Sequence, residues 1–369
     1  MPMKSYLLVH PSLEHIAQQE LQEQAHISST IHPQVIEFDS PPQTLLSLAT
    51  HLQTPRRILL ALGQFNKADD INFLSLPLNL KDIFTNELTF KIEVENLPGI
   101  DNRLALSKAA ATKFYQALAP TSLNPQINLK HPDILIIIYA NQDHFFVGID
   151  LTGLELNTRS YRVFPHQSSF KGDLAYYFLR QSTFSPEKKT LLGFAKDGSI
   201  AIEAALFSSH TPPHNPSTFS CTKFPLMQSL PLSFTSPTSH PSPPSPPSIK
   251  NSIYVFDETT QNTTAIRKNA LIAKVNSVLT IAKHPLDEVD LKYDPASFDI
   301  ALFQVTSKDE EKINDLYYSV DYILKPRGIL FIIGRPTWDF PLSQKFNLIE
   351  QQDITKGSST HRYWKLQKK

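Results

Sequence analysis

The chain has 369 residues, with 35 Lys and Arg against 35 Asp and Glu, 41% hydrophobic residues and a single cysteine, Cys221. This length suffices for two or three domains that each bury a core, and one cysteine excludes a disulfide scaffold and a Cys-rich zinc site. Apolar runs reach about seven residues, well short of the roughly 20 that span a membrane. We therefore expect a cytoplasmic protein that has no membrane segment and binds no metal. The zero net charge argues against a protein that binds nucleic acid by charge alone.

The first 160 residues predict two small α+β domains. Residues 1–65 contain strand, helix, strand, helix and strand patterns in that order, with Ser12 placed to cap the first helix. This order is typical of a ferredoxin-like unit. Residues 66–160 predict a strand, a long helix and two further strands, which the turn at 141–144 joins as a hairpin.

From residue 161 onward, short apolar strands alternate with helices, a pattern that predicts right-handed crossovers and a parallel, Rossmann-like sheet. A segment at 211–249 interrupts this pattern. It holds 11 of the chain's 29 prolines, all within 212–248, and we expect an extended linker or surface insertion. Its histidines have no carboxylate or cysteine at ligand spacing, so we expect no metal there, and we interpret Cys221 as incidental.

In a doubly wound sheet, ligands bind beyond the carboxyl ends of the strands. Three residues stand there in this sequence. Gly198 lies in a tight turn before a helix, which suits a phosphate or cofactor but also fits an ordinary strand-to-helix turn. Asp257 stands where such sheets hold ribose hydroxyls, or it caps the following helix. Gln304 carries an amide that both donates and accepts hydrogen bonds, or it is simply a loop residue.

Several stretches resemble one family, the THUMP-domain RNA methyltransferases that use S-adenosylmethionine (SAM), which includes the large-subunit ribosomal RNA guanine methyltransferases. In the first half, "TPRRILLALGQF" is similar to the family's "ASRILLPLGEF", and "NTRSYR" to its "L.KRGYR" segment. In the second half, "LLGFAKDGSIAIEAAL" resembles "LLDPFCGSGTIAIEAAL", and "SFDIALFQVTS" resembles "FDLIVTNPPY". Asp257 and Asn269 keep the spacing of the family's "D…N" pair.

The resemblance implies a fold, a cofactor and a set of site residues. It implies a THUMP-like RNA-binding domain over 66–160 and, over 161–369, a class I methyltransferase domain with a mostly parallel seven-stranded sheet. It places Gln304 against the amine to be methylated. The residues it implies for SAM are Gly193, Asp197, Gly198, Ser199 and Asp257. Those it implies for RNA, or that we expect to contact phosphate, are Arg56, Arg57, Arg159, Tyr161, Arg162 and Lys171. Arginines at domain surfaces also commonly form ion pairs instead.

Two motifs depart from the family pattern. Gly193 and Phe194 replace an Asp-Pro pair, and we align the following turn as one residue shorter than "GSGT". The Asn-Pro-Pro-Tyr motif, which positions the target amine and stacks on its base, is replaced by residues 304–307, Gln-Val-Thr-Ser. The acid that commonly contacts adenine is also missing, with Lys283 and His284 in its place and Asp287 as a substitute.

These departures leave alternative functions open. The first is an active methyltransferase that modifies a guanine exocyclic amine in ribosomal RNA, in particular 23S ribosomal RNA. The second is an RNA-binding protein that has lost catalysis. The third is methylation of an adenine amine in DNA. The resemblance of the first half to THUMP domains favours RNA over DNA as the substrate.

Overall fold

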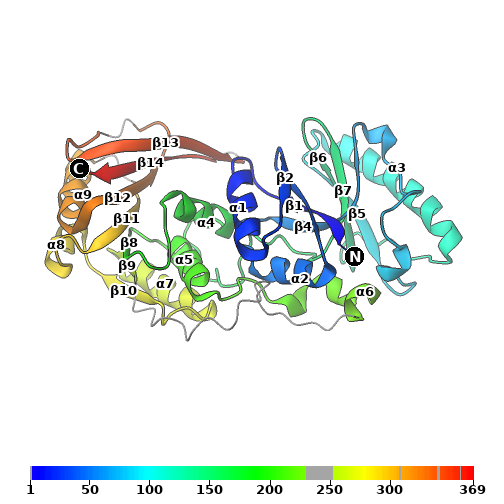
Figure 1. Ribbon diagram of the computed structural model, residues 1–369, viewed down its shortest axis with the longest axis horizontal. Coiled ribbons are helices and arrows are strands. Elements are labelled where there is room, and N and C mark those ends of the chain that lie inside the picture. Colours follow the sequence, from blue (N-terminus) through cyan, green and yellow to red (C-terminus); the bar gives the residue numbers. More distant parts are fainter. Residues whose placement is uncertain (1, 230–251, 307–308, 339–340, 358) are drawn as a thin grey trace. The chain divides into compact units, whose positions relative to one another are not determined.

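The computed structural model describes residues 2–229, 252–306, 309–338, 341–357 and 359–369 (Figure 1). These residues form two compact units. The N-terminal unit contains residues up to Leu156 together with the segment from His214 to 229, and the C-terminal unit contains Asn157–Pro213 and the described residues from 252 onward.

A single seven-stranded sheet organises the N-terminal unit, in the order β2-β3-β1-β4-β7-β6-β5. The predicted boundary at residue 65 falls inside this unit, because β4 from the first predicted domain pairs with β7 from the second. The structure therefore joins the two predicted N-terminal domains in one sheet. The strands are β1 (Met3–Leu8), β2 (Ser29–His32), β3 (Val35–Ser40), β4 (Arg57–Phe65), β5 (Phe90–Glu95), β6 (Ile134–Ala140) and β7 (Phe145–Asp150).

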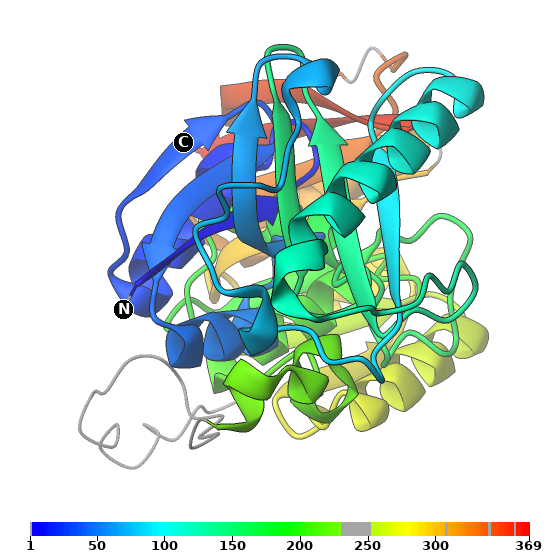
Figure 2. The same ribbon diagram turned by 90° about the vertical axis from the view of Figure 1, so that its right-hand side faces the viewer.

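Three long helices accompany this sheet: α1 (Glu14–Ala25), α2 (Pro42–His51) and α3 (Ile100–Leu118). Figure 2 shows α3 running across the strands of the β5 side, and the Ser107 hydroxyl on α3 donates to the Ile92 carbonyl of β5. The predicted cap of α1 is wrong, because Leu13 stands at the N-cap and no side chain caps the helix. Ser12 instead has a positive φ of 74°.

The described part of the proline-rich segment is not an extended linker. Residues 214–229 form short helical turns and α6 (Pro225–Gln228), and they pack on the N-terminal unit. The backbone N–H groups of Ser220 and Cys221 donate to the carbonyls of Thr152 and Leu151. The side chains buried by this packing are Phe219, Cys221, Phe224 and Met227. Because burial raises the pKa of the Cys221 thiol to about 12, this cysteine is a packed apolar residue. The rest of the predicted insertion lies mostly outside the described residues.

Asp133 bonds residues 214–229 to the residue that precedes β5, and its lowered pKa makes the stability of the fold depend on pH. Its carboxylate accepts hydrogen bonds from Lys223 at 2.5 Å and from the backbone and hydroxyl of Thr89. Burial acts to raise the pKa of Asp133, but these hydrogen bonds outweigh it and lower the pKa to about 2. A carboxyl whose pKa is lower in the folded chain stabilises it above the ordinary pKa of 3.8 and loses that contribution as the pH falls toward 2.

We therefore expect Asp133→Asn to unfold at lower urea at pH 7 and to lose less stability than the wild type between about pH 4 and pH 2. Urea unfolding at stepped pH measures both. Lys223→Gln should remove part of the same pH dependence, since it deletes one of the donors. Identical pH slopes for wild type and Asp133→Asn would contradict this account.

The C-terminal unit confirms the predicted Rossmann-like architecture. Its seven-stranded sheet has the order β10-β9-β8-β11-β12-β14-β13, and the first five strands pair in parallel. The long antiparallel hairpin of β13 and β14 was not predicted. The strands are β8 (Thr190–Gly193), β9 (Ile253–Asp257), β10 (Leu279–Lys283), β11 (Phe298–Gln304), β12 (Leu324–Gly334), β13 (Phe346–Lys356) and β14 (Ser359–Lys368).

Helices α4 (Gly172–Gln181), α5 (Ser199–Ser209), α7 (Thr260–Ile272), α8 (Val289–Lys292) and α9 (Glu310–Ile323) connect or cover these strands. Helix α5 is almost entirely buried, which its apolar sequence on all faces explains. An aromatic and aliphatic core that includes Phe256, Phe303 and Trp364 packs on one face of the sheet. In the part of the chain that the structure describes, no helix is both long and apolar enough to cross a membrane.

Candidate functional site at the strand ends of the C-terminal unit

The parallel strands β8, β9 and β11 end at one edge of the sheet, which is where a doubly wound fold binds ligands. The turn after β8 is unusual because Phe194 and Lys196 have positive φ angles of 56° and 57°, like Gly198 at 82°. Glycine adopts this conformation without steric cost. The conformation agrees with a second alignment of the motif, in which Lys196 stands on the first glycine of "GSGT" and the turn keeps its full length.

Asp197 and Ser199 are brought together at the start of α5, where both side chains are buried. One Asp197 carboxylate oxygen accepts from the backbone and hydroxyl of Ser199, at 3.1 and 2.7 Å. The other accepts from Arg162 Nε at 2.9 Å and from the His166 backbone at 3.2 Å. The chain's own donors thus occupy both oxygens, and Asp197 orders the turn.

Asp257 ends β9 as predicted and is only 3% exposed. Its Oδ1 accepts from the Asn262 side chain at 2.9 Å and from the backbone and hydroxyl of Thr259. Its Oδ2 accepts from the Lys196 backbone at 3.1 Å. Asp257 therefore links the turn after β8 to the start of α7, where Thr259 and not Asp257 is the N-cap.

Residues 162–170, named here the cover segment, are bonded to Asp197, to Asn269 of α7 and to Gln304. Arg162 and His166 reach Asp197, as described above. The Asn269 amide exchanges hydrogen bonds of 3.0 Å with the Phe164 backbone and donates to the Asp197 carbonyl at 3.0 Å. Gln304 Nε2 donates to the Ser168 carbonyl. These bonds hold the cover segment against the edge at which β8, β9 and β11 end.

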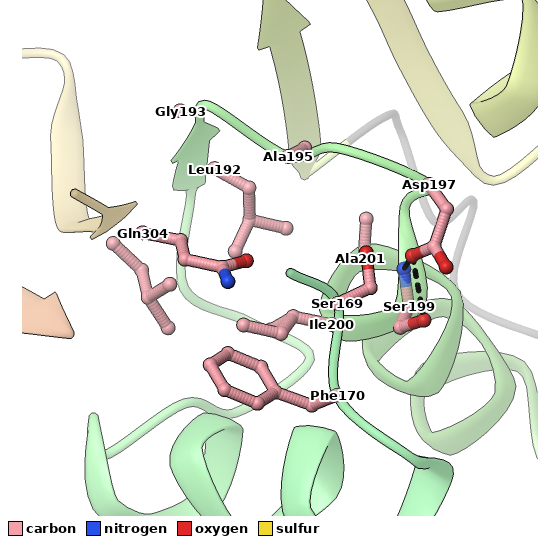
Figure 3. Close-up of a pocket in the computed structure, with 11 residues that line it drawn as sticks. Ser169, Phe170, Leu192, Gly193, Ala195, Asp197, Ser199, Ile200, Ala201 and Gln304 are labelled. Carbon is pink, nitrogen blue, oxygen red and sulfur yellow. Dashed lines mark hydrogen bonds between the residues drawn. The ribbon is translucent and has the colours of Figure 1, made fainter. Parts of the chain in front are cut away.

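Little space remains beside the predicted cofactor residues. A cavity of about 10 Å³ is lined by Phe170, Gly193, Asp197, Ser199 and Gln304, among others (Figure 3). Figure 3 shows the Gln304 amide at this cavity, opposite the bonded pair Asp197 and Ser199. A second cavity of about 80 Å³ adjoins Phe194, Glu258 and Lys312. Ligand pockets commonly measure about 300 to 1,000 Å³. Each of these two cavities is smaller than that range.

The predicted RNA ligands near residue 56 are engaged in ion pairs within the N-terminal unit. Arg56 bonds Glu95 and Glu155, and Arg57 bonds Glu95 at 2.9 Å and Asp150 at 2.6 Å. The Arg57 side chain is 8% exposed and Asp150 is fully buried. The structure thus shows the ion pairing that was the alternative interpretation for these two arginines.

Arg159 and Tyr161, which were predicted to contact RNA, are both buried. Arg159 Nε and Nη2 donate to the two oxygens of Glu203 at 2.8 and 3.0 Å, and the Tyr161 hydroxyl donates to the same carboxylate at 2.7 Å. Burial, followed by the Glu203 charge, raises the pKa of Tyr161 well above its ordinary value. Of the other predicted RNA ligands, Arg162 is bonded to Asp197, and Lys171 is exposed.

The position predicted for an adenine-binding acid contains none. His284 is buried and stacks on Phe256 at 4.3 Å, with its ring nitrogens near the Pro285 carbonyl and the Tyr293 hydroxyl. Lys283 and Asp287 are exposed. Within the described ranges, no three His, Cys, Asp or Glu side chains form a group that could hold a metal ion.

Sequence reasoning missed the residues that complete this edge of the sheet. Thr259 and Asn262 bind Asp257, and only the N-terminal position of Thr259 on its helix could have indicated it. A further cavity of about 480 Å³ lies beyond the ends of β11 and β12, beside Gln304 and Arg335. No motif in the sequence pointed to Arg335.

Comparison with known families finds a match that lies mostly within the C-terminal unit. Residues 159–302 match the family described as RMKL-like, methyltransferase domain. This part of the chain is therefore similar to RMKL-like methyltransferase domains. A 164-residue stretch is 30% identical to ribosomal RNA large subunit methyltransferase K/L of Buchnera aphidicola subsp. Schizaphis graminum, covering 42% of this chain and 23% of the relative. The protein of the same name from Shewanella amazonensis is 26% identical over 174 residues, covering 46% and 24%. The chain thus spans about a quarter of the length of these curated relatives.

Solved structures share the fold of these matched residues and of the rest of the chain. SMU.472, complexed with SAH, superposes with a TM-score of 0.73 at 16% identity and covers 99% of this chain and 97% of its own. TrmN from Thermus thermophilus superposes with a TM-score of 0.68 at 17% identity and covers 99% of both chains. At such identities the likeness shows the fold.

Proposed function

We propose that the chain transfers a methyl group from SAM to an exocyclic amine in RNA, with Gln304 holding that amine. The Gln304 side chain at the end of β11 carries this proposal. Its Nε2 donates to the Ser168 carbonyl, which orients the amide. Oε1 remains available as an acceptor, and it lies beside the cavities lined by Gln304. An acceptor held in this way suits the N–H of an amine.

SAM as methyl donor is supported by the similarity to RMKL-like methyltransferase domains and by the SAH bound in SMU.472. When bound, SAM supplies the methyl group. The chain's own residues contribute position, which is a large term when two reactants must be aligned. Asp257 stays our candidate for the ribose, and Gly193, Asp197, Gly198 and Ser199 for the methionine end. Because the described cavities there are small, we infer that the turn at 194–198 moves when SAM binds.

The proposed substrate is ribosomal RNA, because both curated relatives are named for the large subunit of the ribosome. We propose a guanine amine, as in the family that the sequence resembles. An RNA of this kind would place the protein in the cytoplasm. The predicted THUMP-like role of residues 66–160 stays part of this proposal.

The hydrogen bonding within the cofactor region favours a second candidate, an RNA-binding protein that no longer transfers a methyl group. The two buried carboxylates of the region, Asp197 and Asp257, accept hydrogen bonds from donors of the chain. Displacing those donors would offset part of the energy of cofactor binding.

Calorimetric titration of SAM into the full chain distinguishes the two candidates. For the first, we expect micromolar affinity that falls by at least about tenfold in Asp257→Asn, since one charge-assisted contact is lost. Asp315→Asn, on the exposed face of α9, is the matched control and should bind as the wild type does. Equal thermal unfolding midpoints would show that all three proteins are folded. Absence of heat up to millimolar SAM would reject the first candidate and leave the second.

A further inference from the structure

The cavity beyond β11 and β12 has the size of a ligand site. It measures about 480 Å³ and is lined from β11, β12, β14 and the cover segment, all within the C-terminal unit. This volume lies within the usual range for small-molecule pockets. The cavity shares Gln304 and Phe170 with the 10 Å³ cavity, so a group bound in it lies next to the candidate amine acceptor.

The polar lining of this cavity suits an anion. Arg335 follows the last residue of β12 and is exposed, and its guanidinium makes no hydrogen bond or ion pair with any residue that the structure describes. Thr306, Thr337 and Thr360 line the same space, while no Asp or Glu among the described residues does. A guanidinium that has no partner among the described residues and lies beside neutral hydrogen-bond donors is suited to binding a phosphate.

The apolar lining suits a base. Phe170 meets the His361 ring edge to face at 5.0 Å, and both rings line the cavity. Burial, and then the charge of Arg335, lower the pKa of His361. The ring is therefore neutral at pH 7, and it presents an aromatic surface without competing for the anion. Aromatic faces of this kind stack on unpaired bases.

We propose that Arg335 binds a phosphate of the RNA nucleotide whose base enters this cavity beside Gln304. The inference rests on the proposed RNA substrate and adds to it the residue that positions the nucleotide. Because a phosphate contact carries no sequence information, Arg335 positions any nucleotide, while Gln304 and the rings contact the base.

Fluorescence anisotropy with a short single-stranded RNA, without SAM, tests the inference. We expect Arg335→Gln to weaken binding by about tenfold at low salt and to reduce the slope of log affinity against log salt by about 0.7, the value for one phosphate on a single strand. Arg335→Lys should bind with an affinity between those of the wild type and Arg335→Gln, since lysine keeps the charge but lacks the planar guanidinium. Arg327→Gln is the matched control, because Arg327 is exposed at the opposite end of β12. It should leave both affinity and slope unchanged.

Competition of guanosine and of GMP with the RNA distinguishes the contribution of the phosphate to binding from that of the base. Wild type should prefer GMP, and Arg335→Gln should bind the two alike. If the wild type binds RNA and Arg335→Gln binds it with the same affinity and slope, the inference is overturned and the proposed function stands. If the wild type binds no RNA, the RNA substrate itself is rejected, and the inference falls with it.

Discussion

Glu203→Ala is expected to lower the free energy of unfolding of the C-terminal unit by about 3 to 5 kcal/mol, the usual result of breaking a buried ion pair. Glu203 and Arg159 are both fully buried, and two hydrogen bonds join them. Removing the carboxylate leaves the guanidinium charged and without its counter-ion in the interior, since an arginine does not deprotonate in proteins. Urea unfolding followed by circular dichroism measures the loss.

Two further variants separate charge from packing. The double variant Arg159→Met with Glu203→Leu removes both charges and should recover most of the stability, because apolar residues of similar volume replace buried pairs well. Asp353→Asn breaks the pair between Arg362 and Asp353 on the surface hairpin, where the side chains are 25% and 44% exposed. It should cost less than about 1 kcal/mol. Equal losses for the buried and surface pairs would contradict the assignment of Arg159 to the core.

Gly193→Asp, which would bring back the acid that the sequence motif lacks, is expected to destabilise the C-terminal unit by about 2 to 5 kcal/mol. Gly193 lies between its partners Phe256 on β9 and Phe303 on β11. A Cβ at this position would stand 2.2 Å from Phe303 Cε1 and 2.9 Å from Phe256 Cε1. The side chain would thus meet two rings and bury a carboxylate among them. Thermal and urea unfolding measure the loss.

The cause can be tested with matched variants. Gly357→Asp makes the same change where no atom lies within 4 Å of the added Cβ, and aspartate tolerates the positive φ of 61° found there, so we expect at most about 1 kcal/mol. Adding Phe303→Ala to Gly193→Asp should cost less than the sum of the two single changes, because the ring is the obstacle. Additive losses would show that the clash is not the cause.

The strands and helices of the C-terminal unit were predictable because their apolar residues are local and periodic, as in β11 and α5. The hairpin of β13 and β14 was missed, since its strands carry many polar, partly exposed residues. The packing of residues 214–229 on the N-terminal unit was missed because the many prolines indicated a linker, although a few spaced apolar residues of this segment are buried. Composition does not show which distant surface such residues cover.

The position of the candidate site in the fold was predictable from the sequence, but the contacts of its side chains were only partly predictable. Asp257 and Gln304 end their strands as the pattern of parallel strands indicates. The burial of Arg159 depends on Glu203, which lies 44 residues away, and no local pattern pairs them. Likewise, Arg335 stands out only because it lies beside a cavity and has no partner among the residues that the structure describes.

The packing of residues 214–229 on the N-terminal unit has a consequence for how the protein is made. The ribosome must synthesise the whole of Asn157–Pro213, which belongs to the other unit, before the side chains of Phe219, Phe224 and Met227 are available. Domains generally fold as they emerge, the N-terminal one first. Here the N-terminal unit cannot complete its packing until part of the C-terminal unit has emerged. Until then, the surface that these residues cover stays exposed. A nascent chain that stalls before residue 214 would expose that apolar surface and offer a binding site to chaperones.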